Sequence, residues 1–212
     1  MTTDLSFKIG GEAGQGLQTV GYILAKSLVK SGLYVFANQD NESRIRGGHN
    51  FYQVRASDMP VQAHSEKIHV IVALDQRSIA EHKAELATDG VIIFDGEKIK
   101  PSETIDSLLN VPFERLAKEK AGTASMANSV AVGATLSLIQ GDFNVLASVL
   151  KDEFKEKGLE IVEKNSQAAR AGYDYVTGNA AGRFKHKIVA AMHPKDRILL
   201  SGNEAIASSA LI

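Results

Sequence analysis

The sequence of 212 residues contains no cysteine. This absence excludes disulfide bonds, a thiol nucleophile and cysteine-ligated iron–sulfur clusters within the chain. If the chain takes part in redox chemistry that uses such clusters, we expect them to lie on a partner.

The sequence also lacks long apolar runs and an excess of positive charge. No stretch of about 18 uncharged apolar residues occurs, and the amino terminus Met1-Thr2-Thr3-Asp4 has neither the basic region nor the apolar run of a signal peptide. The formal net charge is -1 and the pI is near 6.6, so the broad positive field of a nucleic-acid-binding protein is missing. We expect a cytoplasmic protein with no membrane or nucleic-acid partner.

The composition is that of an ordinary globular domain. Hydrophobic residues make up 44% and charged residues 23% of the chain, near the averages for folded proteins. The length accommodates one domain with a sizeable core and an accessory tail.

The first third of the chain alternates between two periodicities. Leu5–Ile9 reads as a strand that stops at two glycines, and Tyr34–Ala37 reads as a second strand. Between them, small and apolar residues recur every three or four positions on one helical face, which Gly32 ends. These are Leu17, Val20, Gly21, Leu24, Leu28 and Ser31.

The same alternation continues along the chain. The apolar runs Ile68–Leu74 and Val91–Phe94 flank a helical pattern, which consists of Ile79, His82, Lys83 and Leu86. Alternating strands and helices predict an α/β fold with a Rossmann-like, mostly parallel sheet flanked by helices. Before Ile68, the residues of 51–55 alternate as in a half-exposed strand, which predicts an added hairpin.

Beyond Gly122 the pattern is helical. Met126, Val130, Gly133, Ala134 and Leu138 form one stripe, most simply a core face, and Phe143–Phe154 and Leu159–Tyr175 follow. A glycine-containing segment from Gly178 to Gly182 then reads as the start of a linker. We predict a domain over residues 1–177, a linker over 178–195 and a further piece over 196–212.

The most informative motif is the glycine-rich turn from Gly10 to Gly16, Gly-Gly-Glu-Ala-Gly-Gln-Gly. Such a turn between a strand and a helix lets backbone N–H groups approach an anion, and the helix dipole adds to the attraction. Its glycine order departs from the dinucleotide fingerprint G-x-G-x-x-G, and Asn38 and Asp40 only loosely supply the expected acid. The glycines fit ligand binding and tight helix–strand packing equally well.

The second motif runs from Ser43 to Asn50, Ser-Arg-Ile-Arg-Gly-Gly-His-Asn, after the second strand. Arg44 and Arg46 suit a phosphate or carboxylate, and Gly47 and Gly48 permit a backbone with positive φ. Ligand sites of parallel sheets lie at such strand ends. The alternative is a solvated turn whose arginines pair with nearby acids.

Together these motifs resemble the γ domain of the 2-oxoacid:ferredoxin oxidoreductases, a family that includes pyruvate and 2-oxoglutarate ferredoxin or flavodoxin oxidoreductases. Both occur in order and at the right separation, and the similarity covers about residues 5–177. It continues through Val70–Asp75, Gly90–Asp95 and Asn128–Gly133.

The resemblance implies a division of labour. Enzymes of this family decarboxylate a 2-oxoacid on thiamine diphosphate, transfer the acyl group to coenzyme A and pass electrons through iron–sulfur clusters to ferredoxin. Thiamine diphosphate, Mg²⁺ and the clusters are then expected on an α domain and a β subunit, with no catalytic residue or metal ligand here. The residues expected to contribute to coenzyme A binding are Gly11, Gly14, Gln15, Gly16, Arg44, Arg46, Gly47, Gly48 and Asn128.

The tail from Ile198 to Ala207 resembles the opening of the thiamine pyrimidine-binding domain in family members whose γ and α parts are fused. Ser201 or Asn203 is expected to cap a helix there. We interpret the chain as the truncated amino-terminal part of a fused γ–α subunit that is inactive alone and exposes apolar surface for self-association. The alternative is a terminal helix docked on its own domain.

Other chemistry has less support. His64 and His69, or His186 and His193, lack the spacing of a zinc pair, so we expect surface histidines. Asp75 and Asp95 stand where acids commonly cap helices. Two other functions stay open: a nucleotide-dependent oxidoreductase domain that binds NAD(P), and a purely structural assembly module.

Overall fold

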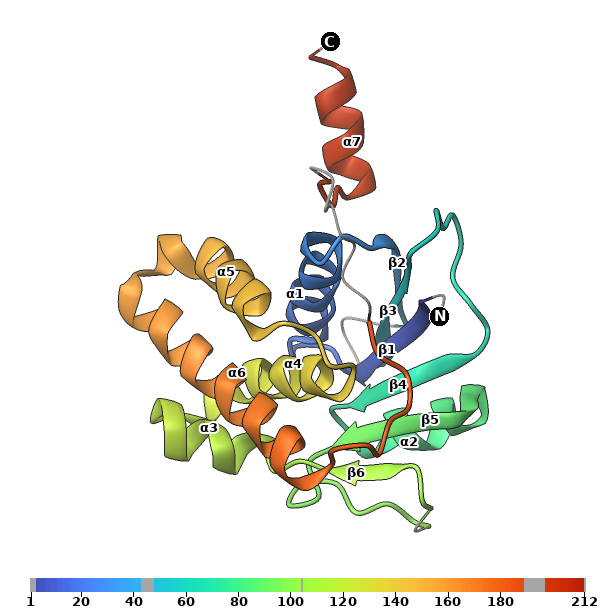
Figure 1. Cartoon of the computed structure of the whole chain (residues 1–212), viewed down its shortest axis with the longest axis vertical. Helices are drawn as coiled ribbons and strands as arrows, with labels where there is room; N and C mark the ends of the chain where they lie inside the picture. The colour runs from blue at the N-terminus through green and yellow to red at the C-terminus, as the bar shows by residue number, and fades with distance from the viewer. Residues whose placement is uncertain (1–2, 43–47, 104, 189–196, 212) are drawn as a thin grey trace.

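Strands and helices alternate through the first half of the protein, and helices dominate the second half (Figure 1). The computed structural model describes residues 3–42, 48–103, 105–188 and 197–211. The strands are β1 (Asp4–Glu12), β2 (Tyr34–Asn41), β3 (His49–Ser57), β4 (Ile68–Ala73), β5 (Leu86–Phe94) and β6 (Leu108–Asn110). The helices are α1 (Leu17–Lys30), α2 (Gln76–His82), α3 (Phe113–Ala121), α4 (Ala127–Leu138), α5 (Phe143–Phe154), α6 (Leu159–Asn179) and α7 (Gly202–Ser209).

The strands form one mixed sheet in the order β2-β3-β1-β4-β5-β6. β1, β4, β5 and β6 pair in parallel, which confirms the expected α/β fold with a mostly parallel sheet. The predicted hairpin exists, but β2 is one of its strands, and β3 lies antiparallel between β2 and β1. The hairpin is therefore part of the main sheet and not an addition to it.

Two local details differ from the sequence pattern. Leu86 begins β5 and does not continue the preceding helix, because α2 ends at His82 and a short 3₁₀ turn follows. The pattern also did not predict β6 and α3, which together span residues 108–121.

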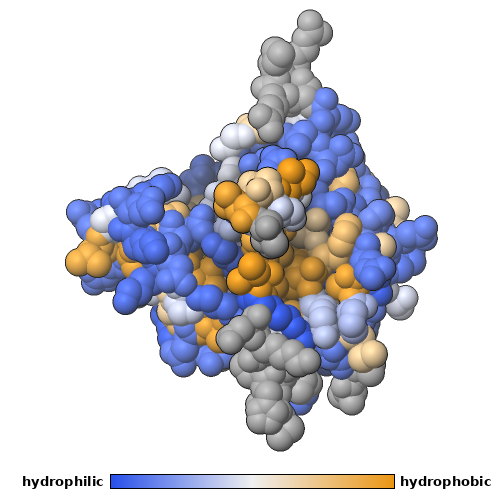
Figure 2. Space-filling model, turned by 90° about the horizontal axis from the view of Figure 1, so that it is seen from above, coloured by the Kyte–Doolittle hydropathy of each residue, from blue (hydrophilic) through white to orange (hydrophobic). Residues whose placement is uncertain are grey.

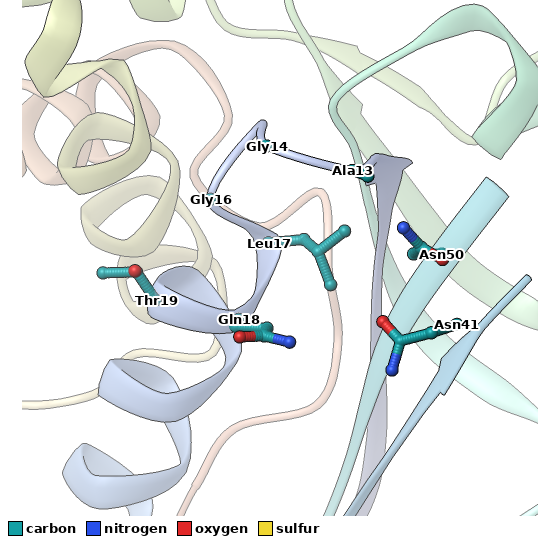
Figure 3. A pocket seen from close by; sticks show the side chains of 8 residues that line it. All are labelled: Ala13, Gly14, Gly16, Leu17, Gln18, Thr19, Asn41 and Asn50. Atoms are coloured by element: carbon teal, nitrogen blue, oxygen red, sulfur yellow. The ribbon is translucent and has the colours of Figure 1, made fainter. Parts of the chain in front are cut away.

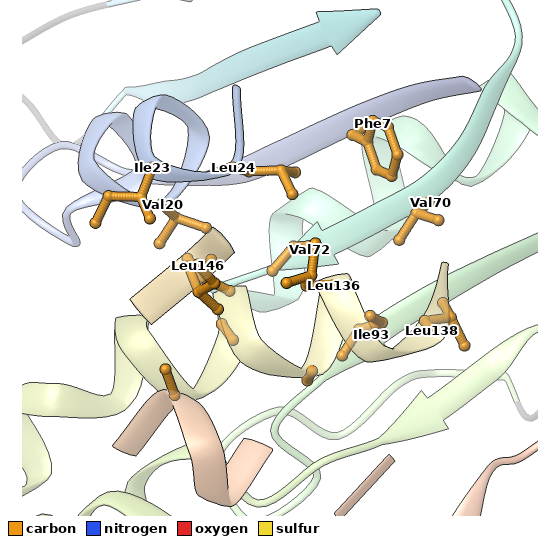
Figure 4. Close-up of a cluster of buried hydrophobic side chains, with 14 of the residues drawn as sticks. Phe7, Val20, Ile23, Leu24, Val70, Val72, Ile93, Leu136, Leu138 and Leu146 are labelled. Carbon is orange, nitrogen blue, oxygen red and sulfur yellow. The ribbon is translucent and has the colours of Figure 1, made fainter. Parts of the chain in front are cut away.

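One face of the sheet is covered by α1 and α4; α5 and α6 pack on these helices, and the main hydrophobic core lies between the layers (Figure 4). Alternate residues of β1, namely Leu5, Phe7 and Ile9, point into this core and are almost fully buried. The predicted stripe on α4 is confirmed as core, since Val130 and Leu138 are buried and Met126 packs against them.

The pair α4 and α6 packs unusually closely because glycines face the partner backbone. A Cβ atom on Gly133 would lie 1.9 Å from the carbonyl oxygen of Ala169, and one on Gly172 would lie 2.1 Å from that of Val130. Both distances are far below van der Waals contact. These two glycines therefore set the separation of the helices.

The opposite face of the sheet carries less cover. α2 packs over β4 and β5 on a small apolar cluster that includes Ile71, Ile79 and Ile92. Over β1 and β3 most outward residues are polar, and Phe51 lies among them against Lys8 and His82. Loop 58–67 covers part of this surface: the side chains of Gln53 and Arg55 donate to the carbonyl oxygens of Ser65 and Ala63.

The carboxyl-terminal segment has two parts. After α6, Phe184 and Ile188 are buried, and the Ile188 N–H donates to the Ile139 carbonyl oxygen over 3.0 Å. α7 lies apart, with no buried residue, and Ser201 caps it in a capping box with Glu204. Among the described residues, no helix combines the length and apolar character that a membrane crossing requires.

Candidate functional site

The glycine-rich turn joins the carboxyl end of β1 to α1, which is the strand–turn–helix unit expected from the sequence. The Gln15 N–H donates to the Glu12 carbonyl oxygen over 3.2 Å and closes the turn. Gly14 and Gly16 have φ angles of 92° and 77°, a left-handed conformation that favours glycine. At these two positions the glycines are required by the backbone itself.

Two side chains hold the turn in shape. The Gln15 side-chain oxygen accepts from the Glu12 N–H over 2.8 Å, and the Asn128 side-chain nitrogen donates to the Gln15 carbonyl oxygen over 2.9 Å. A Cβ atom on Gly16 would lie 2.3 Å from that Asn128 nitrogen, and one on Gly11 would lie 2.6 Å from the Gln15 side-chain oxygen. Gln15, Asn128 and Gly11 thus shape the turn, and none of them lines the pocket beside it.

This pocket has a volume of about 500 Å³ and opens between the turn and β2 and β3 (Figure 3). Its lining residues are Ala13, Gly14, Gly16, Leu17, Gln18, Thr19, Asn41 and Asn50. Leu17, Gln18 and Thr19 form the first turn of α1, where backbone N–H groups lack partners within the helix. Gly16 is the N-cap residue of α1 and has no side chain that could accept from these N–H groups, and the first turn has no acid. Within the described helix, nothing therefore offsets the positive end of the helix dipole beside the pocket.

The opposite wall consists of two asparagines at the end of the hairpin. Asn41 of β2 pairs with Asn50 of β3, and the Asn50 side-chain oxygen accepts from the Glu42 N–H over 3.0 Å. Arg44, Arg46 and Gly47 lie outside the described residues, and Gly48 is buried just before β3. The segment that carries the arginines is therefore bounded on both sides by pocket residues.

The sequence did not identify every lining residue. Asn50 stood in the second motif without a role, and Gln18, Thr19 and Asn41 were not singled out. The register of the β2–β3 hairpin is the signal that would have placed Asn41 opposite Asn50. This register cannot be predicted from the sequence unless β2 and β3 are first recognised as the paired strands of the hairpin.

Asp75 and Asp95 have local structural roles. Asp75 caps α2 by accepting from the Ser78 N–H, and Asp95 accepts from the Glu97 and Glu114 N–H groups, as expected of capping acids.

The expectation of surface histidines holds for His64 but is wrong for His69. His69 is half-buried, and its Nδ1 accepts from the Ser6 N–H over 3.1 Å. His186 is also partly buried, with its ring centroid 5.3 Å from that of His69. His193 lies outside the described residues.

The topology separates this site from that of a dinucleotide-binding domain. In that fold the acid that binds the ribose follows a strand next to β1. Here the antiparallel β3 lies between β1 and β2, so Asn38 and Asp40 are displaced by one strand from the glycine turn. This arrangement disfavours the NAD(P) hypothesis.

The fold and the site define a Rossmann-like α/β domain whose glycine turn leads into a helix with an uncapped amino terminus. A family model described as pyruvate ferredoxin/flavodoxin oxidoreductase matches residues 6–175. The chain belongs to this family.

Relatives include both long and short proteins. The chain is 26% identical to the 2-oxoacid:ferredoxin oxidoreductase subunit alpha of Sulfolobus sp, over 96% of this chain and 38% of that protein. It is 28% identical to the 2-oxoglutarate synthase subunit KorC of Methanothermobacter marburgensis, over 80% of this chain and 95% of that subunit. The chain thus spans well under half of the alpha subunits and nearly all of the shorter subunit.

Similar solved structures also include a long chain and a short subunit. The 2-oxoglutarate:ferredoxin oxidoreductase of Magnetococcus marinus, with 2-oxoglutarate, coenzyme A and succinyl-CoA bound, superposes with a TM-score of 0.88 and 26% identity, over 100% of this chain and 37% of that chain. The keto/oxoacid ferredoxin oxidoreductase gamma subunit of Geobacter sulfurreducens superposes with a TM-score of 0.70 over 83% of this chain and 98% of that chain; at 23% identity it shows the shared fold.

Proposed function

We propose that this chain is the γ domain of a 2-oxoacid:ferredoxin oxidoreductase and contributes to assembly and to coenzyme A binding. The supporting observation is the pocket between the glycine turn and the asparagines, where the first N–H groups of α1 face outward without a cap. Coenzyme A carries phosphate groups, which bind well at helix amino termini. A structural neighbour over the whole chain has coenzyme A bound.

The reaction requires partners under this proposal. The chain has no cysteine to ligate a cluster, and the γ domain alone would be inactive. Thiamine diphosphate, Mg²⁺ and the clusters would belong to the α domain and β subunit, which would act with ferredoxin in the cytoplasm. The acyl group formed there would pass to the thiol of coenzyme A held partly by this chain.

The residues of the glycine turn and the two arginines each have a defined part in this proposal. Gly14 and Gly16 let the backbone approach a phosphate without a side chain in the way, and Gln15 and Asn128 hold the turn in that conformation. The described residues that line the pocket include no charged side chain. Arg44 or Arg46, from the adjoining segment, would supply the positive charge that pairs with phosphate.

The test uses the assembled enzyme with Arg44→Gln and Arg46→Gln combined. The KM for coenzyme A is expected to rise by about tenfold or more, because a charge-assisted hydrogen bond is lost, while the KM for the 2-oxoacid stays unchanged. Arg115→Gln on α3, whose partners are Glu97 and Glu119, is the matched control. An unchanged KM for coenzyme A in the double variant would contradict the proposed role.

Calorimetry on the purified chain separates the other functions. Coenzyme A binding without NAD(P)H binding supports the proposal, and the reverse result supports a nucleotide-dependent oxidoreductase domain. Binding of neither molecule would favour a purely structural module.

We further propose that residues 178–195 act as a linker and that residues 196–212 open the α part of a fused subunit. α7 buries no residue, although its capping box stabilises it. α7 and the residues on either side of it expose the large apolar side chains Ile198, Leu200, Ile206 and Leu211. Figure 2 looks down on this end of the molecule and shows apolar side chains gathered near the centre of the view. Leu199 packs against the main core, so the deletion begins after it. Deletion of residues 200–212 should leave the Tm of the domain unchanged while weakening association with the partner part; a large fall in Tm would contradict this.

A further inference from the structure

Two histidines from distant parts of the chain meet on the face of the sheet opposite the main helices. His49 begins β3 and His82 ends α2, and their Nε2 atoms lie 2.8 Å apart. Both residues are buried, with 6% and 5% of their surface exposed. They are separated by 33 positions along the chain, so no local sequence motif pairs them.

A carboxylate fixes the orientation of one ring. His82 Nδ1 lies 2.7 Å from Glu85 Oε1, and a carboxylate oxygen accepts, so Nδ1 carries the hydrogen. The lone pair of His82 Nε2 therefore points at His49, whose Nε2 must donate. The other nitrogen of His49, Nδ1, is then a buried acceptor, and among the described residues it has no hydrogen-bond partner.

A third ligand group stands beside the two rings. Glu81 Oε2 lies 4.0 Å from His49 Nε2, and the other oxygen of this carboxylate accepts from Arg77 Nε. One ligand atom from each of His49, Glu81 and His82 lies within 4.8 Å of the others. Two imidazole nitrogens and one carboxylate oxygen thus lie close enough together to share one ion.

We propose that His49, His82 and Glu81 bind a divalent transition-metal ion of the zinc class. Two histidines and one glutamate are a known zinc ligand set that leaves a fourth position for water or another ligand. Tetrahedral Zn–N bonds of about 2.0–2.1 Å place two nitrogens about 3.3 Å apart. The two rings, tilted by 41°, need to separate by only about half an ångström from their present 2.8 Å. The ion replaces the shared hydrogen, and the His49 hydrogen moves to Nδ1.

The surroundings match those of protein metal sites. A ligating histidine usually donates its other N–H to a carboxylate, as His82 does to Glu85. Lys8 Nζ pairs with the other oxygen of Glu85, which offsets its positive charge. Arg77 holds Glu81 and also reaches Glu42.

The position of this site suggests what an ion would do. His49 directly precedes Asn50 of the candidate coenzyme pocket, and its backbone N–H donates to Glu42 Oε2 over 2.9 Å. An ion would tie the start of β3 to the end of α2, beside the segment that joins β2 to β3. This inference does not depend on coenzyme A binding, because the ligands face the other side of the sheet from Asn50.

The test is titration of chelator-treated chain with Co²⁺ and Zn²⁺. We expect one Co²⁺ per chain with the visible absorption of a tetrahedral site, displacement of Co²⁺ by Zn²⁺, and a higher Tm with Zn²⁺. His82→Ala should weaken binding by about 100-fold or more, because each ligand supplies a share of the binding free energy. His64→Ala, which removes an exposed histidine outside the cluster, should bind as the wild type does.

Two further measurements keep the test decisive if His82→Ala fails to fold. Glu81→Gln changes a partly exposed side chain and should also weaken Co²⁺ binding. In the wild-type chain, Zn²⁺ should shift the imidazole NMR signals of His49 and His82 and leave that of His64 unchanged. Absence of stoichiometric binding, or shifts confined to other histidines, would overturn the proposal.

Discussion

At β1 and β3 the two faces of the sheet differ in what they bury, although the same strands supply both: one face is apolar and the other is mostly polar. On β1, the residues Leu5, Phe7 and Ile9 enter the core beneath the helices, while Ser6 and Lys8 point to the other side. All five are buried, yet only the second set needs polar partners. The Lys8 side chain finds one in Glu85, whereas the buried Ser6 hydroxyl has none among the described residues. The Ser6 backbone N–H donates to His69.

The two faces therefore gain their stability in different ways. The helix-covered face gains stability from apolar area removed from water, which depends on shape and tolerates no extra atoms. Over β1 and β3 the opposite face, which we call the polar face, gathers charged and titratable groups whose stability depends on pairing, because an unpaired buried polar group is costly. Mutations on the first face should therefore act through volume, and mutations on the second through charge and hydrogen bonds.

The largest effect should follow from crowding the α4–α6 contact. Gly133→Ala would place a Cβ atom 1.9 Å from the Ala169 carbonyl oxygen, so the helices must separate, at a cost of about 3 kcal/mol. The matched control is Gly178→Ala in the partner helix α6, where an added Cβ atom would meet no described atom outside its own helix within 4 Å; it should stabilise the protein by about 0.5–1 kcal/mol. Urea unfolding measures the free energy of unfolding of both variants. Equal changes would show that the close approach of α4 and α6 does not determine how much an added methyl group destabilises this face.

On the polar face, Lys8→Met should cost about 1–3 kcal/mol, since it leaves Glu85 without its cationic partner. Adding Glu85→Gln should recover part of that loss, a coupling that a double-mutant cycle in chelator-containing buffer would detect. Lys83→Met provides the control, because its pair with Glu103 is largely exposed and should cost under about 1 kcal/mol. Additive effects of the Lys8 and Glu85 changes would argue that packing, and not pairing, holds this face.

Most elements of the helix-covered face follow directly from local sequence periodicity, with α3 as an exception although its apolar residues join the main core. The strand, glycine turn and helix from Leu5 to Gly32 form as expected, and α5 has the predicted bounds Phe143–Phe154. Apolar spacing identifies such elements because each buries one continuous face against the core.

The polar face was harder to predict because its contacts join distant positions. Alternation suggested a strand near Phe51 but could not show that β3 inserts between β1 and β2. The meeting of His49 with His82, and of Asn41 with the glycine turn, depends on that insertion. Strand order is a property of the folded sheet, so no local pattern contains it.

A smaller effect should appear as pH dependence at His69. Burial lowers the pKa of His69 from its usual 6.5, and the neighbouring His186 lowers it further, against the opposing charges of Asp89 and Asp4. The unfolded chain then binds the proton more tightly than the folded chain does, so this group's contribution is fully present above pH 6.5 and is lost as the pH falls through 6.5 toward the folded-state pKa.

His69→Gln keeps an acceptor for the Ser6 N–H but cannot take up a proton. It should therefore flatten the rise in unfolding free energy between about pH 5 and 6.5, the range in which a histidine ordinarily changes charge. His64→Gln, at an exposed position, should keep the wild-type slope. A wild-type slope in His69→Gln would assign the pH dependence to other groups.

The smallest effect is expected at the edge of the polar face, where Arg55 Nε and Nη2 donate to the two carboxylate oxygens of Asp4 over 2.9 and 2.7 Å. The hydrogen bond from Arg55 lowers the pKa of Asp4, so the pair stabilises the fold above the usual value of 3.8 and loses that contribution as the pH falls below it. Because the Asp4 side chain is 49% exposed, solvent screening limits Arg55→Gln to a loss of under about 1 kcal/mol, which should shrink further in 1 M salt. A loss that stays the same in high salt would mean that Arg55 acts through its hydrogen bond to loop 58–67, and the polar face would then depend on packing at its rim as well as on charge.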